Sequence, residues 1–115
     1  MERSDEAATL LVYGSLLDAR RREEVIGHPV EVAAAELPDY ETGRVCYFYL
    51  RPRRGVSTRG LLLLNLTNQD FEQLDRYEEL PRLYTREHIE VLDQRGNRLR
   101  CWVYLPTRLV FDGIE

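Results

Sequence analysis

Apolar residues in this chain occur in short runs, many of which alternate with polar residues as they do along strands. The first run, residues 10–13, is β-branched and aromatic and stops at Gly14-Ser15, which indicates a buried strand that enters a turn. Similar runs recur further along the chain. Together they predict about six strands, at residues 10–13, 30–34, 44–50, 60–66, 84–92 and 99–105.

Turn-forming residues separate these runs. The segment 37–40 (Leu-Pro-Asp-Tyr) is expected to end the second strand, and Pro52 and Gly55 are expected to open a polar loop. Residues 93–97 predict a hairpin turn between the last two strands. The tail from residue 106 has no clear pattern.

Two segments have the pattern of helices. Asp18 is a suitable N-cap for a short helix that runs to Ile26. The main helix is predicted from Thr67 to about Glu79, because Thr67 can cap it and Asp70 suits the positive end of a helix. The proline at position 81 is expected to stop it.

The order of these elements predicts one α+β domain over residues 1–115, with residues 1–8 as a frayed leader. We expect a small mixed β-barrel of about six strands, flanked by one or two helices. A chain of this length can bury one substantial core.

The amino-acid composition excludes several kinds of function. All 16 basic residues are Arg, so a catalytic lysine is excluded. The net charge is −4, whereas a protein that binds nucleic acid is expected to carry an excess of basic residues. We therefore expect no nucleic acid as a partner. No apolar run reaches the length of a membrane span, and residues 1–6 do not resemble a signal peptide. We therefore expect a cytoplasmic protein without a membrane partner.

The residues available as metal ligands are few. Cys46 and Cys101 lie in separate predicted strands and can pair only if those strands are neighbours; two reduced, partly buried thiols are the favoured interpretation. With only His28 and His88 besides, no pattern of metal ligands is present. We expect neither a metal nor an organic cofactor.

The main helix directs an acid inward. At 100° per residue, Phe71, Leu74 and Glu78 fall within one narrow arc, and the first two must face the core. Glu78 therefore points toward the interior or a cavity, where an unpaired carboxylate is costly. The alternative is a salt bridge, for instance to Arg86 or Arg59, or a side chain that reaches solvent.

The turn after the first strand is the second candidate. Gly14 can let the backbone approach a ligand, so that successive N–H groups bind a carboxylate or an oxyanion. The alternative is an ordinary strand exit, in which Gly14 takes a positive φ and Ser15 caps the next turn of the chain. Ser15 is a poor nucleophile candidate because no histidine is placed to activate it.

Four motifs occur in a characteristic order: V-Y-G-S-L-L-D at 12–18, G-L-L-L-L-N-L-T at 60–67, F-x-x-L-D-x-Y-E at 71–78 and Y-x-R at 84–86. In this order the chain resembles the gamma-glutamylcyclotransferase-like family, including its AIG2-like branch, from about residue 10 to residue 104. The resemblance implies a compact β-barrel with a pocket between the Y-G-S-L loop and the acid.

The resemblance also implies an activity and a set of site residues. Enzymes of this family cyclise a small gamma-glutamyl compound to 5-oxoproline and release an amine or amino acid, without a cofactor. Glu78 matches the family's acid and is the expected general acid/base. The expected substrate-binding residues are Tyr13, Gly14, Ser15, Leu16 and Tyr84.

The chain departs from the family at two turns. The family usually has Gly after the acid, where this chain has Glu79, and its L-P-G-Y turn is Leu-Pro-Asp-Tyr at residues 37–40. Partial burial, with the like charge of Glu79 adjacent, is expected to raise the pKa of Glu78 toward that of the substrate ammonium.

Two other functions compete with an enzyme. One is a module of the same fold that binds a carboxylate-bearing metabolite without turnover. The other is a protein-interaction role of the aromatic segment 47–49, which is less favoured because aromatics that alternate along a strand usually divide between core and surface.

Overall fold

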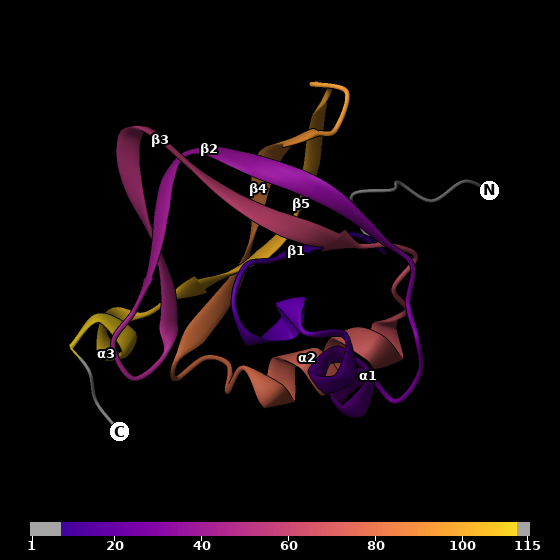
Figure 1. The fold of residues 1–115 in the computed structure, drawn as a ribbon. Coiled ribbons are helices and arrows are strands. Elements are labelled where there is room, and N and C mark those ends of the chain that lie inside the picture. Colours follow the sequence, from indigo (N-terminus) through magenta and orange to yellow (C-terminus); the bar gives the residue numbers. More distant parts are fainter. Residues whose placement is uncertain (1–7, 113–115) are drawn as a thin grey trace.

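Five strands form a closed barrel in the computed structural model, which describes residues 8–112 (Figure 1). They are β1 (Leu10–Val12), β2 (Val32–Arg44), β3 (Phe48–Leu63), β4 (Tyr84–Asp93) and β5 (Arg98–Pro106). Their order around the barrel is β1-β3-β2-β4-β5. β1 runs parallel to β5 and the other pairs are antiparallel. The predicted mixed α+β barrel is thus confirmed, with five strands in the described residues where about six were predicted.

The strand count differs because β2 and β3 are longer than predicted. The segment 37–40 does not end β2; the strand continues through a bulge in which Asp39 takes a φ of 63° and the register shifts between Pro38 and Tyr40. The expected loop at Pro52 and Gly55 is part of β3, so two predicted strands are one. Pairing with β2 on the facing edge overrides the local turn signals.

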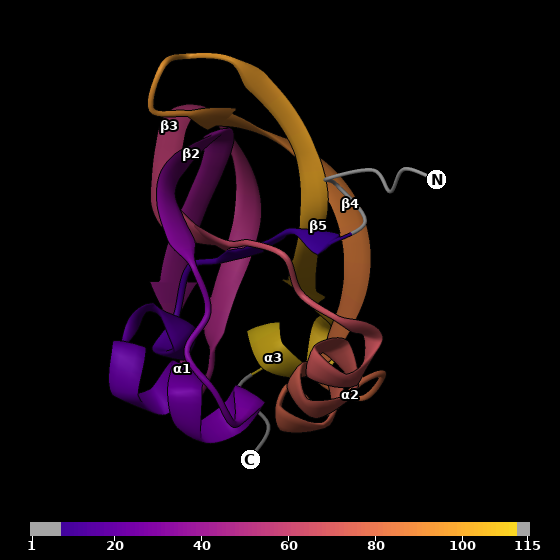
Figure 2. The same cartoon turned by 90° about the vertical axis from the view of Figure 1, so that its right-hand side faces the viewer.

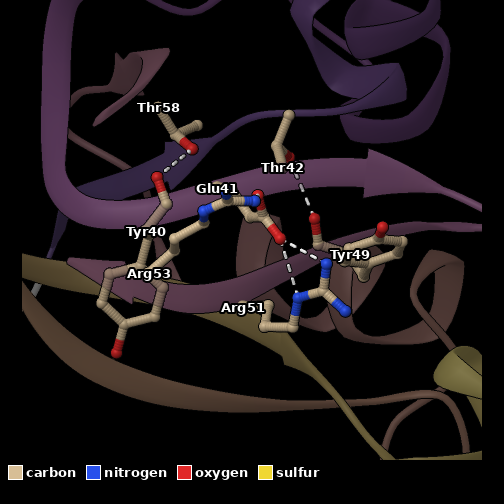
Figure 3. A network of polar contacts seen from close by, with 7 residues as sticks. All are labelled: Tyr40, Glu41, Thr42, Tyr49, Arg51, Arg53 and Thr58. Atoms are coloured by element: carbon tan, nitrogen blue, oxygen red, sulfur yellow. Dashed lines mark hydrogen bonds and ion pairs between the residues drawn. The ribbon is translucent and has the colours of Figure 1, made fainter. Parts of the chain in front are cut away.

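Polar side chains stabilise this long hairpin across the two strands (Figure 3). The Glu41 carboxylate accepts hydrogen bonds from Arg51 and, at 3.0 Å, from Arg53. The Thr58 hydroxyl donates to the Tyr40 carbonyl at 2.9 Å, beside the bulge. The bulged Asp39 accepts from the Gly55 amide at 2.9 Å. These contacts link β2 to β3 at the bulge and beside it.

Both predicted helices are present and lie at one end of the barrel (Figure 2). In α1 (Ala19–Ile26) the Asp18 side chain caps the Arg21 amide at 2.8 Å, as predicted. In α2 (Asn68–Tyr77) Thr67 and Asp70 form a capping box. A 3-10 turn, η2 (Ser15–Leu17), follows β1, and a short helix, α3 (Arg108–Phe111), lies in the tail that had no predicted element.

The core is divided between two faces of β1. Leu10 and Val12 contribute to a cluster that includes Phe71 and Leu74 of α2, whereas Leu11 packs in a second cluster formed by the other strands. Because every residue of β1 is buried, this short strand is fixed on both faces. The turn that follows it is therefore held firmly against the end of the barrel where the helices lie.

The cysteines and the first residues differ partly from expectation. Cys101 is buried in β5, whereas Cys46 lies exposed in the turn between β2 and β3, not in a strand, and the two form no disulfide. Of the expected leader, residues 1–7 lie outside the described residues; Ala8 is buried, and its carbonyl accepts from the Leu66 amide at 2.9 Å. No helix within residues 8–112 combines the length and apolar character needed to cross a bilayer.

Candidate active site

A cavity of about 330 Å³ lies between the turn after β1 and the C-terminal end of α2. The structure brings together in its wall all of the residues that the sequence indicated for the site: Tyr13, Gly14, Ser15, Leu16, Glu78 and Tyr84. A volume of this size is at the lower end of the range for small-molecule sites, roughly 300–1,000 Å³. The cavity therefore suits a small metabolite.

Gly14 is required by close packing. A Cβ atom at this position would lie 2.8 Å from the Phe48 ring, closer than carbon atoms can approach. Its φ is −128°, so the alternative in which Gly14 takes a positive φ is wrong. The absence of a side chain lets the backbone turn sharply beside β3.

The turn leaves backbone donors available. No residue within 8–112 accepts a hydrogen bond from the amide N–H of Gly14, Ser15 or Leu16. The Gly14 and Ser15 carbonyls, in contrast, accept from the amides of Leu17 and Asp18 at 3.0 and 3.3 Å. Consecutive unpaired N–H groups of this kind can bind a carboxylate or a developing oxyanion.

The Ser15 side chain connects this turn to α2. Its hydroxyl lies 2.7 Å from the Tyr77 hydroxyl, which also accepts a hydrogen bond from Arg21 at 3.2 Å. Ser15 does not cap the turn that comes after it, so that part of the strand-exit alternative is also wrong. Tyr77 was not predicted as a site residue, although its place in the L-D-x-Y-E motif, directly before the acid, was a usable signal.

Glu78 is the C-cap residue of α2, and its amide donates to the Leu74 carbonyl at 2.9 Å. Phe71 and Leu74 are buried, as the helical arc predicts, and Glu78 is half-buried in the cavity wall. No arginine or histidine among the described residues forms an ion pair with it. Burial raises the pKa of Glu78 to about 7, so near neutral pH it can both accept and donate a proton.

The two arginines proposed as alternative partners of Glu78 are placed elsewhere. Arg59 is exposed. Arg86 binds Asp75, at 3.1 and 3.3 Å, and its guanidinium also stacks over the Phe71 ring. Asp75 further accepts from the Tyr104 hydroxyl at 2.6 Å. This network ties α2 to β4 and β5 and fixes the direction of the residue three positions on, Glu78.

Glu79 also borders the cavity, but unlike the half-buried Glu78 it is exposed. It takes a φ of 56° and binds Arg82 at 3.1 Å. Burial alone accounts for the raised pKa of Glu78. The expectation that the charge of Glu79 contributes to this rise is therefore wrong, because the backbone turn at position 79 directs that side chain to solvent.

Tyrosines form the buried part of the wall. The Tyr13 hydroxyl donates to the Tyr104 carbonyl at 2.6 Å, and the Tyr84 hydroxyl donates to the Phe48 carbonyl at 2.5 Å. Burial, together with nearby charge on Glu78, raises the pKa of Tyr13 and of Tyr84. Both hydroxyls therefore stay protonated and act as fixed structural donors.

Several wall residues had no signal in the sequence. Arg21, Arg44, Tyr47, Phe48 and Tyr104 reach the cavity from five different elements or turns. No group of three or more His, Cys, Asp or Glu side chains within residues 8–112 is arranged to hold a metal ion. The cavity wall itself offers the carboxyl groups of Glu78 and Glu79, tyrosine hydroxyls, the backbone amides of the turn and two arginine side chains.

Two curated proteins are similar to this chain. A Methanocaldococcus jannaschii protein, named as a gamma-glutamylcyclotransferase with a proposed RNase activity, is 25% identical over 84% of this chain and 45% of its own length. The AIG2-like protein D of Arabidopsis thaliana is 28% identical over 84% of this chain and 66% of its own. The chain thus spans about half to two thirds of the length of these relatives.

Solved structures show the same fold. A gamma-glutamyl cyclotransferase superimposes with a TM-score of 0.77 over 87% of this chain and 66% of that chain, at 18% identity. A sequence model of the family described as gamma-glutamyl cyclotransferase, AIG2-like, matches residues 10–112. With nearly its whole length matched, the chain belongs to the gamma-glutamyl cyclotransferase, AIG2-like family.

Proposed function

We propose that this protein converts a small gamma-glutamyl amine or amino acid to 5-oxoproline and the free amine, with Glu78 as general acid and base. One observation carries this proposal: an unpaired, half-buried carboxyl group shares a small cavity with the open amides of the turn after β1. Membership of a cyclotransferase family supports the same reaction.

In the proposed reaction the substrate attacks itself. The Glu78 carboxylate takes a proton from the α-ammonium group, and the freed nitrogen attacks the γ-carbonyl carbon. Glu78 then gives its proton to the leaving nitrogen and takes the extra proton from the ring nitrogen. The bond between the γ-carbon and the leaving nitrogen breaks, and Glu78 returns its proton to the free amine or to water.

The pKa of Glu78 suits this exchange. An ordinary Glu, with a pKa of about 4.3, is a weak base for an α-ammonium group with a pKa of about 8. Burial brings the pKa of Glu78 to about 7, which removes most of that difference. Because both reacting groups are on one molecule, holding it folded supplies a large part of the rate, with effective molarities of about 10⁵ M or more.

The amides of residues 14–16 have two possible roles in this scheme. They can anchor the α-carboxylate of the substrate, or they can polarise the γ-carbonyl as negative charge develops on its oxygen. Both roles need donors without internal partners, which this turn supplies. Tyr13 and Tyr84 would form the buried wall against which the glutamyl part folds.

The test is release of 5-oxoproline from a panel of gamma-glutamyl amines and amino acids. Replacing Glu78 with Gln should lower kcat about 100-fold or more, since a general acid/base contributes about that factor. Glu79→Gln is the matched control, because it removes the neighbouring, exposed carboxylate and should leave kcat almost unchanged.

Two results would contradict the proposal. The first is no 5-oxoproline from any compound of the panel. The second is turnover that survives Glu78→Gln. Saturable binding of these compounds without product, and without sensitivity to Glu78→Gln, would instead indicate the alternative, a metabolite-binding module of the same fold.

A further inference from the structure

Arg44 is a cation in the cavity wall whose charge has no use in the reaction proposed above. It is the last residue of β2, and its guanidinium lies 5.0 Å from the centre of the Phe48 ring. No carboxylate within residues 8–112 forms an ion pair with it, although Glu78 and Glu79 line the same cavity. Stacking on a ring that itself packs against Gly14 gives this cation a defined place beside the substrate-binding turn.

The cavity has a deep end and an open end. Two of the residues in its wall, Leu16 and Tyr84, are only 2% and 6% exposed and mark the deep end. Arg44 and Cys46, two residues further along the chain, are exposed and therefore form part of the rim. The part of a substrate that cyclises must reach Glu78 and the turn amides, away from that rim. The leaving group, at the other end of the substrate, would then extend toward Arg44.

We infer that Arg44 binds a carboxylate on the leaving group, which makes gamma-glutamyl amino acids the preferred substrate class over gamma-glutamyl amines. This inference rests on the proposed cyclotransferase function. A guanidinium is suited to the role because its planar donors match the geometry of a carboxylate. A simple amine as leaving group would offer this cation no partner.

Arg21 is the other cation in the wall, and its contacts give it a different role. It donates to the Tyr77 hydroxyl at 3.2 Å and lies 3.9 Å from Glu24 of its own helix. Through Tyr77 it supports Ser15 in the turn. Replacing Arg21 should therefore affect all substrates alike, whereas replacing Arg44 should affect only those with a carboxylate on the leaving group.

The experiment compares gamma-glutamyl-alanine with gamma-glutamyl-ethylamine, which differ only by that carboxylate. The readout is the ratio of their kcat/KM values and its change on substitution, because differences in intrinsic reactivity then cancel. Arg44→Gln should lower the ratio about five-fold, the equivalent of about 1 kcal/mol for an exposed ion pair. Arg44→Lys should restore part of the loss, and 0.5 M salt should reduce the effect.

Arg54→Gln is the control for a general change of charge, because Arg54 is exposed on β3 and does not line the cavity. It should leave the ratio unchanged. If Arg44→Gln lowered kcat/KM equally for both substrates, Arg44 would act on the glutamyl part or on the fold, and the inference would be wrong. An unchanged ratio would also overturn it.

A binding measurement separates this inference from the proposed function. The two compounds are titrated by calorimetry into the Glu78→Gln protein, with and without Arg44→Gln. Tighter binding of gamma-glutamyl-alanine that is lost with Arg44→Gln supports the carboxylate site even if no turnover is found. Turnover of both compounds without this difference in binding would keep the cyclotransferase proposal and refute the role of Arg44.

Discussion

Glu78 should make the protein less stable as the pH rises, and its replacement by Gln should remove that effect. Its pKa is about 7 in the folded protein, against 4.5 as the ordinary value. Between these two values the folded state holds a proton that the unfolded state has lost, so the free energy of unfolding falls as the pH increases. The stability conferred by the protonated group is complete below pH 4.5 and is lost through pH 7.

The size of this change in the free energy of unfolding depends on how far the pKa of Glu78 is raised in the folded protein. A difference of about 2.5 units (7 − 4.5) corresponds to about 3 kcal/mol, at 1.36 kcal/mol per unit. Glu78→Gln keeps the shape of the side chain and cannot ionise. At pH 4 we expect its free energy of unfolding to match the wild type, and at pH 8 to exceed it by about 3 kcal/mol. A residue needed for turnover would thus be one whose loss stabilises the fold.

The assay is urea unfolding of the wild type and Glu78→Gln at intervals from pH 4 to pH 9. The difference between the two proteins is the informative quantity, because other titrating groups, such as His28, contribute equally to both. Glu79→Gln serves as the control and should show no such gain, since that carboxylate is exposed. A difference that stays constant with pH, or a variant less stable at pH 8, would refute the burial of Glu78.

Three further predictions concern the surroundings of the site. Gly14→Ala should lower the free energy of unfolding, measured with denaturant, by about 1–3 kcal/mol and should also lower turnover, because the new methyl group overlaps the Phe48 ring. A fully stable and active variant would contradict this close packing. Glu79→Gly should raise the free energy of unfolding by about 0.5–1 kcal/mol, because its φ of 56° suits glycine; a loss of stability would contradict this. The Nε2 of His28 donates a hydrogen bond to the Asp70 carboxylate at 2.8 Å, and this hydrogen bond raises the pKa of His28. The stability that this pair contributes is therefore complete below pH 6.5 and is lost as the pH rises through the raised value. His28→Gln should therefore cost more at pH 5 than at pH 9, and an equal cost at both would exclude the linkage.

The parts of the fold that the sequence predicted correctly depend on local interactions. The N-caps at Asp18 and Thr67 use side chains that reach an amide three residues away, so sequence spacing alone determines them. The inward direction of Glu78 is set by helical geometry in the same way. These features need no knowledge of what lies across the molecule.

The predictions were wrong or incomplete where contacts between residues distant in the sequence determine the structure. Pro52 and Gly55 have the local character of a loop, but the edge of β2 facing them offers a ladder, and β3 continues. Tyr104 reaches the cavity because β5 pairs with β1, and Arg44 reaches it because the end of β2 pairs with Phe48 of β3. The alternation of apolar and polar residues along a strand predicts which face of the sheet a side chain is on. It predicts neither the closure of the barrel nor which residue lies opposite on the next strand.

The departure from the family pattern at position 79 has a structural explanation. What the end of α2 needs is a residue with positive φ, so that the chain turns away directly after Glu78. Glycine adopts this conformation without cost, whereas Glu79 carries roughly 1–2 kcal/mol of backbone strain, offset only slightly by its exposed ion pair with Arg82. Because the Glu79 side chain points to solvent, the substitution changes stability and not the position of Glu78. The cavity can therefore keep the arrangement on which the proposed chemistry depends, even though the motif itself is altered.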